Sequence, residues 1–208
     1  MPAELPALFH SGIRMTTVAH RIWETFLREG DCAVDLTAGN GHDTLFLAKH
    51  VLPVKEKSAT IGPGCVWAFD IQTTAAASTR QLLERELTPE QLRRVSVINE
   101  CHSNLKQYIQ HKDVRLVCFN LGYLPKGDMQ ITTTPETTLA ALDASLEVLA
   151  IGGHISILAY AGHPGGMEEY EAVRSWAAKL SPHYWGCSLH EFVKSPESAK
   201  LLLICRRK

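Results

Sequence analysis

Short apolar runs along the chain predict strands, and longer stretches with an apolar residue every three or four positions predict helices. The strands are expected at residues 32–36, 66–69, 95–99, 114–119, 154–160, 187–193 and 201–206. The run at 114–119 is almost continuously apolar, as in a central parallel strand buried on both faces. Because strands that alternate with helices form a parallel sheet covered on both sides, the pattern predicts an α/β fold with a doubly wound, seven-stranded, mostly parallel sheet.

Helices are expected in the intervals between the strands, at residues 43–51, 74–87, 135–149 and 168–180. A leading helix lies within residues 14–29, before the first strand, with Thr16 or Thr17 as its N-cap. The sequence Thr88-Pro89-Glu90-Gln91 combines a cap, a first-turn proline and the glutamine of a capping box, which predicts a further short helix. The pair Gly152-Gly153 should end the helix at 135–149.

Length and composition favour one folded unit. The chain has 208 residues, of which 45% are apolar, and this is enough to build a sizeable core. A polar stretch with glycine and proline, at residues 53–64, separates a helix from the strand that follows it. We interpret this stretch as a surface insertion within a single domain that spans residues 1–208.

The charge balance limits the classes of partner. The 21 basic residues almost equal the 22 acidic ones, so a nucleic acid would have to meet a local basic patch. The apolar runs are far shorter than the roughly 20 residues that cross a bilayer, which argues against a membrane partner. No secretory signal is recognisable at the start, so the cytoplasm is the default compartment, although a removed organelle transit peptide would leave no trace. The histidines and cysteines show no metal-binding spacing.

A glycine-containing turn follows the first predicted strand and opens the next helix. Its candidate ligand-binding residues are Asp35, Thr37, Gly39, Asn40, Gly41, Asp43 and Thr44. Glycines let the backbone approach a ligand closely. Asp70 stands directly after the second strand, where an acidic side chain can accept hydrogen bonds from both ribose hydroxyls of an adenosine. The turn and Asp70 together predict a site for a nucleoside cofactor.

The choice of cofactor depends on charge around the turn. A dinucleotide site normally has a third glycine, which would stand at Thr44 and is absent here. The carboxylates of Asp35 and Asp43 would repel a pyrophosphate, whereas they could hold the ammonium of an amino-acid moiety. These features favour S-adenosylmethionine over a nicotinamide dinucleotide.

The end of the fourth predicted strand carries a second motif, Asn120-Leu121-Gly122-Tyr123-Leu124-Pro125. Ligands bind at this edge of an open α/β sheet. The Asn120 side-chain oxygen and the Leu121 carbonyl can accept the N–H hydrogens of an amine, and Tyr123 can stack on a base. The motif is similar to the Asn/Asp-Pro-Pro-aromatic sequence of methyltransferases that act on exocyclic nitrogens, with leucine and glycine in place of the prolines.

Two further segments are candidates for contact with ligand. His102 lies just past the third strand, where the adenine of a nucleoside cofactor would lie. A glycine-rich loop after the fifth strand contains Tyr160 and His163, which could contact substrate.

Several of these motifs together resemble one family. They are the 35–44 turn, Phe69-Asp70-Ile71-Gln72, the long motif from Phe119 to Asp128, Glu136-Thr137-Thr138, and Gly162-His163-Pro164-Gly165-Gly166. The family is known as "putative rRNA methylase" and consists of class I (Rossmann-like) S-adenosylmethionine-dependent methyltransferases. Its members methylate the 5-aminomethyl group of wobble 2-thiouridine in tRNA, so the resemblance implies tRNA modification and an anticodon region as partner.

The resemblance also implies roles for particular residues. The cofactor would be held by Asp35, Asn40, Asp43, Asp70, Gln72 and His102, with Ile71 beside them. Asn120 and Tyr123 would present the substrate amine, and Asn120 would also contact the cofactor. Two segments depart from the family pattern, namely the insertion at 53–64 and residues 193–199, which replace a turn rich in Asn and Gln.

Other functions stay open at this point. The substrate amine could belong to rRNA, a small molecule or a protein, and the neutral overall charge favours a small substrate over RNA. A nicotinamide-dependent dehydrogenase and a non-catalytic nucleoside- or RNA-binding module are less favoured. Asp128 and Tyr123 are candidates for the base that removes the amine proton. A homodimer is allowed by the sequence.

Overall fold

The computed structural model describes residues 14–53, 62–124, 131–193, 195 and 198–208. Its strands are β1 (Cys32–Asp35), β2 (Cys65–Phe69), β3 (Val95–Ile98), β4 (Val114–Leu121), β5 (Leu149–Ala159), β6 (Trp185–His190) and β7 (Lys200–Arg206). Its helices are α1 (Met15–Phe26), α2 (His42–Val51), α3 (Thr73–Glu86), α4 (Pro89–Leu92), α5 (Leu105–Tyr108), α6 (Pro135–Val148) and α7 (Gly166–Ala178), with a 3₁₀ turn at His102–Asn104.

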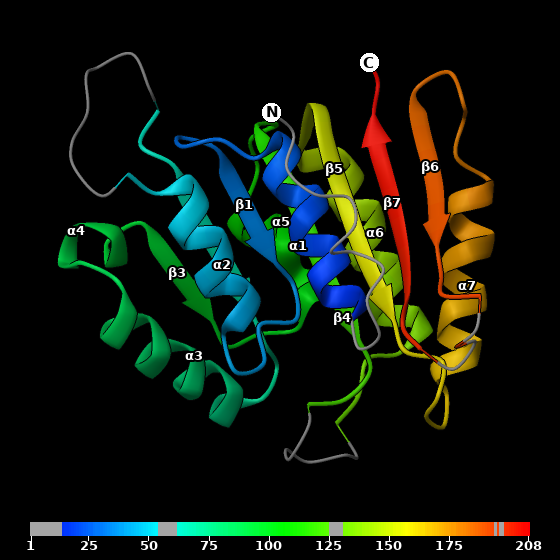
Figure 1. Cartoon of the computed structure of the whole chain (residues 1–208), viewed down its shortest axis with the longest axis horizontal. Coiled ribbons are helices and arrows are strands. Elements are labelled where there is room, and N and C mark those ends of the chain that lie inside the picture. Colours follow the sequence, from blue (N-terminus) through cyan, green and yellow to red (C-terminus); the bar gives the residue numbers. More distant parts are fainter. Residues whose placement is uncertain (1–13, 54–61, 125–130, 194, 196–197) are drawn as a thin grey trace.

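The described strands form one seven-stranded sheet in the order β3-β2-β1-β4-β5-β7-β6. Strands β1 to β5 pair in parallel, and β7 runs antiparallel between β5 and β6. Helices α1, α2 and α3 pack on one face, and α5, α6 and α7 pack on the other (Figure 1). The predicted doubly wound α/β fold is therefore confirmed.

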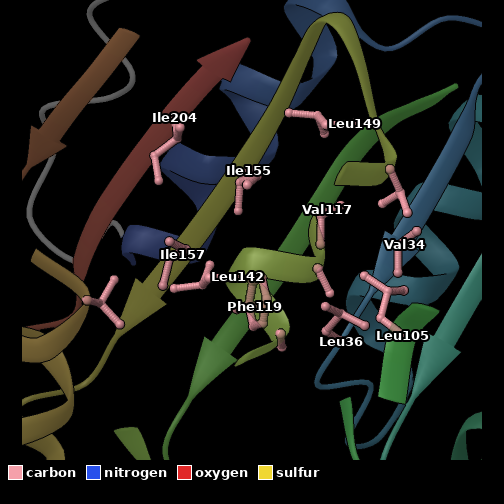
Figure 2. Packing of buried hydrophobic residues seen from close by; sticks show 14 of the residues in the cluster. Val34, Leu36, Leu105, Val117, Phe119, Leu142, Leu149, Ile155, Ile157 and Ile204 are labelled. Atoms are coloured by element: carbon pink, nitrogen blue, oxygen red, sulfur yellow. The ribbon is translucent and has the colours of Figure 1, made fainter. Parts of the chain in front are cut away.

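The sheet separates two hydrophobic clusters, one under each helical layer. In one of them, side chains of the central strands point toward α5 and α6, and Phe119 of β4 lies beside Leu142 of α6 (Figure 2). Phe119 and Leu142 are almost completely buried. Each such side chain stabilises the fold by about 1.5–3 kcal/mol, so β4 is held firmly from both faces.

The strand order reverses between β1 and β4, which places their carboxyl ends at the switch point of the sheet. The chain leaves β1 toward β2 on one side and leaves β4 toward β5 on the other, so the two connections diverge. The crevice between them is where open α/β sheets bind ligands. Both predicted motifs, the turn after β1 and the end of β4, lie at this point.

Two local expectations about helix ends are wrong. The leading helix begins at Met15, so Thr16 and Thr17 lie inside it, and its N-cap residue Arg14 makes no side-chain cap hydrogen bond. The pair Gly152-Gly153 does not end α6, which stops at Val148, but lies within β5. There Gly152 has a φ of +74° and a Cβ on Gly153 would stand 2.8 Å from the carbonyl oxygen of Val114, so the pair permits an irregular pairing with β4.

Other boundaries differ by a few residues. The sixth strand covers 185–190 instead of 187–193, and the capping box at Thr88 and Gln91 is present as expected. Most of the predicted insertion, residues 54–61, lies outside the described residues, as do residues 194, 196 and 197 of the altered C-terminal turn. In the described part of the chain, no helix is long and apolar enough to cross a membrane.

Candidate functional site

A cavity of about 830 Å³ opens at the carboxyl ends of β1, β2 and β4. Of the residues predicted to bind cofactor or substrate, those in its wall are Thr37, Gly39, Asn40, Asp43, Asp70, Ile71, Gln72, His102, Asn120, Leu121, Tyr123, Leu124, Tyr160 and His163. A volume of this size falls in the range of small-molecule and cofactor sites. A separate hollow of about 220 Å³ beside α3 and β3 contains none of them.

Three predicted cofactor-binding residues lie behind the wall of this cavity. Asp35 and Thr44 are completely buried, and the Thr44 hydroxyl donates to Asp35 Oδ2 at 2.6 Å. Gly41 is the N-cap of α2. These residues shape the turn and do not line the cavity. Pro125 and Asp128 lie outside the residues that the structure describes.

The glycine turn after β1 is held by close backbone packing. Gly39 and Gly41 both have positive φ, at +53° and +84°. A Cβ on Gly41 would stand 3.0 Å from Thr79 of α3, so a side chain there would push the turn away from that helix. The Thr79 hydroxyl donates to the Gly39 carbonyl at 3.0 Å. The turn therefore presents backbone to the cavity in a fixed shape.

Asp70 is fixed by two backbone donors at the edge of the cavity. Its Oδ2 accepts from the Gly39 N–H at 2.8 Å, and its Oδ1 accepts from the Gln72 N–H at 2.9 Å. Each carboxylate oxygen still has a free lone pair after one such bond. Both oxygens of Asp70 can therefore accept from neighbouring hydroxyls of a ligand without leaving their present positions.

Two carboxylates lie close together under the turn. Burial, followed by the charge of Asp43, raises the pKa of Asp35 to about 7. The Thr37 N–H donates to Asp35 Oδ1 at 3.1 Å, which opposes this shift. Asp43 is also buried but stands in the cavity wall. A cation that entered the cavity would meet the field of both groups.

His102 presents an acceptor to the cavity. Its Nδ1 lies 3.2 Å from the Leu36 carbonyl oxygen, which can only accept, so Nδ1 carries the proton. Burial lowers the pKa of His102, which favours the neutral ring. Its Nε2 is buried and has no partner among the described residues. A ligand N–H group, such as an exocyclic amine of a base, would satisfy this nitrogen.

The end of β4 is connected to the turn by two hydrogen bonds. The Asn120 N–H donates to the Thr37 hydroxyl at 2.6 Å, and Asn120 Nδ2 donates to Asp43 Oδ2 at 2.7 Å. A carboxylate only accepts, so the amide nitrogen of Asn120 must face Asp43. The amide oxygen is left without a partner among the described residues, in the wall of the cavity.

The segment after Asn120 is supported by a network of three side chains, of which the sequence analysis named only Thr138, as part of a family motif. The Gly122 N–H donates to the Thr133 hydroxyl at 2.7 Å, and that hydroxyl donates to Glu169 at 2.6 Å. Glu169 is buried on α7 and accepts a second hydrogen bond from the Thr138 hydroxyl at 2.7 Å. This network fixes the backbone that carries Tyr123.

Exposed aromatic side chains stand at the mouth of the cavity. Tyr123 is 37% exposed and Tyr160 is 39% exposed. The Tyr123 ring meets the His163 ring edge-on, with centroids 5.5 Å apart. Such rings offer faces on which a planar ligand can stack.

Further cavity residues were not predicted to contact ligand, namely Arg14, Thr16, His42, Glu100, Cys101, Thr132, Thr133, Thr134 and Thr137. Of these, His42 and Thr137 belong to motifs that carry the family resemblance. Glu100 and Cys101 follow β3 directly, so the rule that sites form at strand ends could have found them. Arg14 and Thr16 come from the start of α1, and no local pattern marks them. The described residues contain no group of three or more side chains suited to a metal ion.

The geometry can be tested against S-adenosylmethionine. The unpartnered Nε2 of His102 can accept from the adenine amine, and the two oxygens of Asp70 can accept from the ribose hydroxyls. The carboxylate of Asp43, in the wall of the cavity, can face the ammonium group. The residues of this chain thus fit the cofactor that the sequence predicts.

Comparisons with known proteins agree with this fit. A model of the family described as "Putative rRNA methylase" matches residues 66–206. The chain is 39% identical over 195 residues to an Arabidopsis thaliana protein named tRNA (mnm(5)s(2)U34)-methyltransferase, chloroplastic, covering 93% of this chain and 70% of that one.

Two solved structures are similar along nearly the whole chain. A putative rRNA methylase from Clostridium thermocellum has a TM-score of 0.83 and 35% identity, over 93% of this chain and 98% of the other. A putative methyltransferase from Streptococcus mutans, solved in complex with SAH, has a TM-score of 0.77 and 30% identity with the same coverage.

Proposed function

The chain belongs to the "Putative rRNA methylase" family of S-adenosylmethionine-dependent methyltransferases, and from this premise we propose that it N-methylates the 5-aminomethyl group of wobble uridine in tRNA. The product would be 5-methylaminomethyluridine, with or without sulfur at position 2. The observation that carries the proposal is the Asn120 amide, whose nitrogen is engaged by Asp43 so that its oxygen is left for a donor in the cavity.

An amine nucleophile needs the acceptors that the end of β4 offers. The Asn120 oxygen and the Leu121 carbonyl would each accept an N–H hydrogen, which points the nitrogen lone pair along one direction. The bound cofactor supplies the electrophilic methyl group with its own leaving group. The nitrogen gains the methyl and loses one proton, while S-adenosylhomocysteine departs. Positioning would supply most of the rate enhancement.

The cofactor would be held by the residues on the β1 and β2 side of the cavity. Asp70 would accept from the ribose hydroxyls, and His102 Nε2 would accept from the adenine amine. Asp43 would face the ammonium of the methionine moiety. Asp35, buried behind the cavity wall, would add its electrostatic attraction for the ammonium. Asn40, Ile71 and Gln72 line the same part of the wall.

The choice of tRNA is supported by the named Arabidopsis relative and by the mouth of the cavity. Tyr123 and Tyr160 are exposed there, and an aromatic ring that stacks on a flipped base stabilises binding by about 1–3 kcal/mol. Arg14 adds an exposed cation in the wall. An unpaired anticodon base fits such a site because it can leave its stack at low cost. The local basic patch that would bind the anticodon stem, and a homodimer, remain predictions.

The compartment is part of the proposal. The relative named as chloroplastic supports an organelle as an alternative to the cytoplasm that the sequence predicts.

Mass spectrometry of nucleosides tests the reaction directly. Purified protein, S-adenosylmethionine and tRNA bearing 5-aminomethyluridine are incubated together, and the digested nucleosides are compared with a reaction lacking the cofactor. One added methyl on that nucleoside is expected. No methyl on it, from protein shown by calorimetry to bind S-adenosylhomocysteine, would reject the wobble uridine as substrate and turn attention to rRNA, protein or small amines.

A further inference from the structure

A chain of three side chains connects the leading helix to the amine-binding end of β4. His20 of α1 lies with Nε2 2.7 Å from Asp43 Oδ1, and Asp43 Oδ2 accepts from Asn120 Nδ2 at 2.7 Å. The three residues come from α1, α2 and β4, and they are separated by 23 and 77 positions. One carboxylate oxygen of Asp43 is thus hydrogen-bonded to His20, and the other is hydrogen-bonded to Asn120.

The ring of His20 is fixed by aromatic neighbours. It stacks on Phe46 of α2 with centroids 4.0 Å apart and planes 20° apart. Trp23, one turn further along α1, lies 5.0 Å from the same ring and is completely buried. These contacts leave the imidazole little freedom to turn away from Asp43. The His20 side chain is 25% exposed, so most of it is shielded from solvent.

The directions of the hydrogen bonds follow from the carboxylate at the centre. Asp43 can only accept, so both His20 and Asn120 must donate to it. Without the bond to His20, Asp43 Oδ1 would be a buried acceptor with no protein partner, and the carboxylate could rotate about its last bond. The Asn120 amide would then lose the group that decides which of its ends faces the cavity.

We propose that His20 is a positioning residue for methyl transfer: through Asp43 it keeps the Asn120 amide oxygen turned toward the substrate amine. This inference rests on the proposed function for its kinetic part. It adds a role for α1, which also packs on the sheet and contributes Thr16 to the cavity wall.

Three variants separate this role from simple packing. His20→Gln keeps an N–H donor at similar reach, and His20→Leu removes the donor while filling space. His50→Ala is the matched control, because His50 stacks on the same Phe46 ring at 4.1 Å but donates to the Phe46 carbonyl and does not contact Asp43.

The expected kinetic result is a loss in turnover with little change in binding. His20→Leu should lower kcat about tenfold, with KM for tRNA and Kd for S-adenosylhomocysteine within about twofold of the parent protein. His20→Gln should recover most of kcat, and His50→Ala should match the parent. Parent-like kcat in His20→Leu, or equal losses in His20→Leu and His20→Gln, would overturn the proposal.

A spectroscopic measurement keeps this test independent of the substrate. In ¹⁵N-labelled protein, the side-chain NH₂ signal of Asn120, assigned by its absence in Asn120→Asp, should be shifted by its hydrogen bond to Asp43. His20→Leu should move or broaden this signal, and His50→Ala should not. An unchanged signal in His20→Leu would refute the positioning role even if tRNA proved to be the wrong substrate.

Discussion

The two sides of the cavity are built differently. On the β1 and β2 side, two of the polar groups that face the cavity are fixed by the backbone: Asp70 accepts from the N–H groups of Gly39 and Gln72, and His102 lies against the Leu36 carbonyl. Asp43 is the exception, because the side chains of His20 and Asn120 hold it. On the β4 and β5 side, Tyr123 and Tyr160 are more than one third exposed, and support comes from side chains such as Thr133 and Glu169. The path of the chain therefore fixes most of the first side, and contacts between side chains fix the second.

This difference indicates how the site divides its work. A cofactor of fixed shape suits a rigid, backbone-defined wall, because such a wall requires no ordering when the ligand binds. A large substrate suits an open face with aromatic rings, which can accept a base that swings in from outside. Asn120 stands at the boundary, since its backbone contacts Thr37 and its side chain contacts Asp43. Substitutions on the two sides should therefore change different measured quantities.

The largest effect is expected on the cofactor side. Asp70→Ala removes the proposed acceptor of the ribose hydroxyls and frees two backbone N–H groups of the turn, so Kd for S-adenosylhomocysteine should rise about 100-fold. Isothermal titration calorimetry measures it, and Asp70→Asn, which keeps one acceptor, should give an intermediate value. Unchanged affinity in Asp70→Ala would show that the ribose hydroxyls do not bind to Asp70.

A second effect concerns stability and pH. The pKa of Asp35 is near 3.8 in an unfolded chain and about 7 in the fold. As the pH rises from 4 to 7, the unfolded chain gives up this proton first, so the free energy of unfolding falls, and the loss is complete above the folded pKa. Between pH 5 and 8, the cofactor-free protein should lose roughly 2 kcal/mol relative to Asp35→Asn. Urea unfolding at both pH values measures this; parallel curves for the two proteins would contradict it.

The smallest change in cofactor affinity is expected for Asn120, at the boundary between the two sides, where the main change should be in kcat. Asn120→Ala should lower kcat by about tenfold or more, because the amine loses an acceptor, while cofactor affinity stays within a few-fold. Single-turnover assays and calorimetry on the same preparation give both numbers. Equal activity in this variant would remove Asn120 from the reaction, and a parallel loss of cofactor affinity would erase the division between the two sides.

Most of the fold could be predicted from the sequence because helix and strand periodicity is a local property. The errors lie where tertiary contacts decide. Gly152 and Gly153 look like a helix stop, but their close approach to the Val114 carbonyl places them in a strand. Arg14 replaces Thr16 or Thr17 as the N-cap, because α1 begins two or three residues earlier than its cap signals indicate.

The candidate site could be predicted in part, for a related reason. Residues directly after strands, such as Asp70 and Asn120, converge on one edge whenever the strands are parallel, so topology alone brings them together. His20 and Glu169 lie on helices, and their partners depend on how those helices pack, which no spacing in the sequence reveals. Asp35 also lies at the end of a strand, but it does not line the cavity, because it is buried beneath the turn and bonded to Thr44.

The pairing of β1 with β4 also bears on how the protein assembles. The hydrogen bond between Thr37 and Asn120 joins residues 83 positions apart, so the segment between them forms a long loop that this pairing must close. Closing a long loop lowers the entropy of the chain before the new contacts stabilise it, and contacts between distant residues therefore slow folding. A chain that has paired only β1, β2 and β3 already holds the glycine turn and Asp70, yet it lacks Asn120, the residue proposed to bind the substrate amine. Such a partly formed sheet could bind a nucleoside but could not transfer a methyl group. A methyl-transfer assay therefore detects only protein with the complete sheet, whereas a nucleoside-binding assay would also detect the partly formed one.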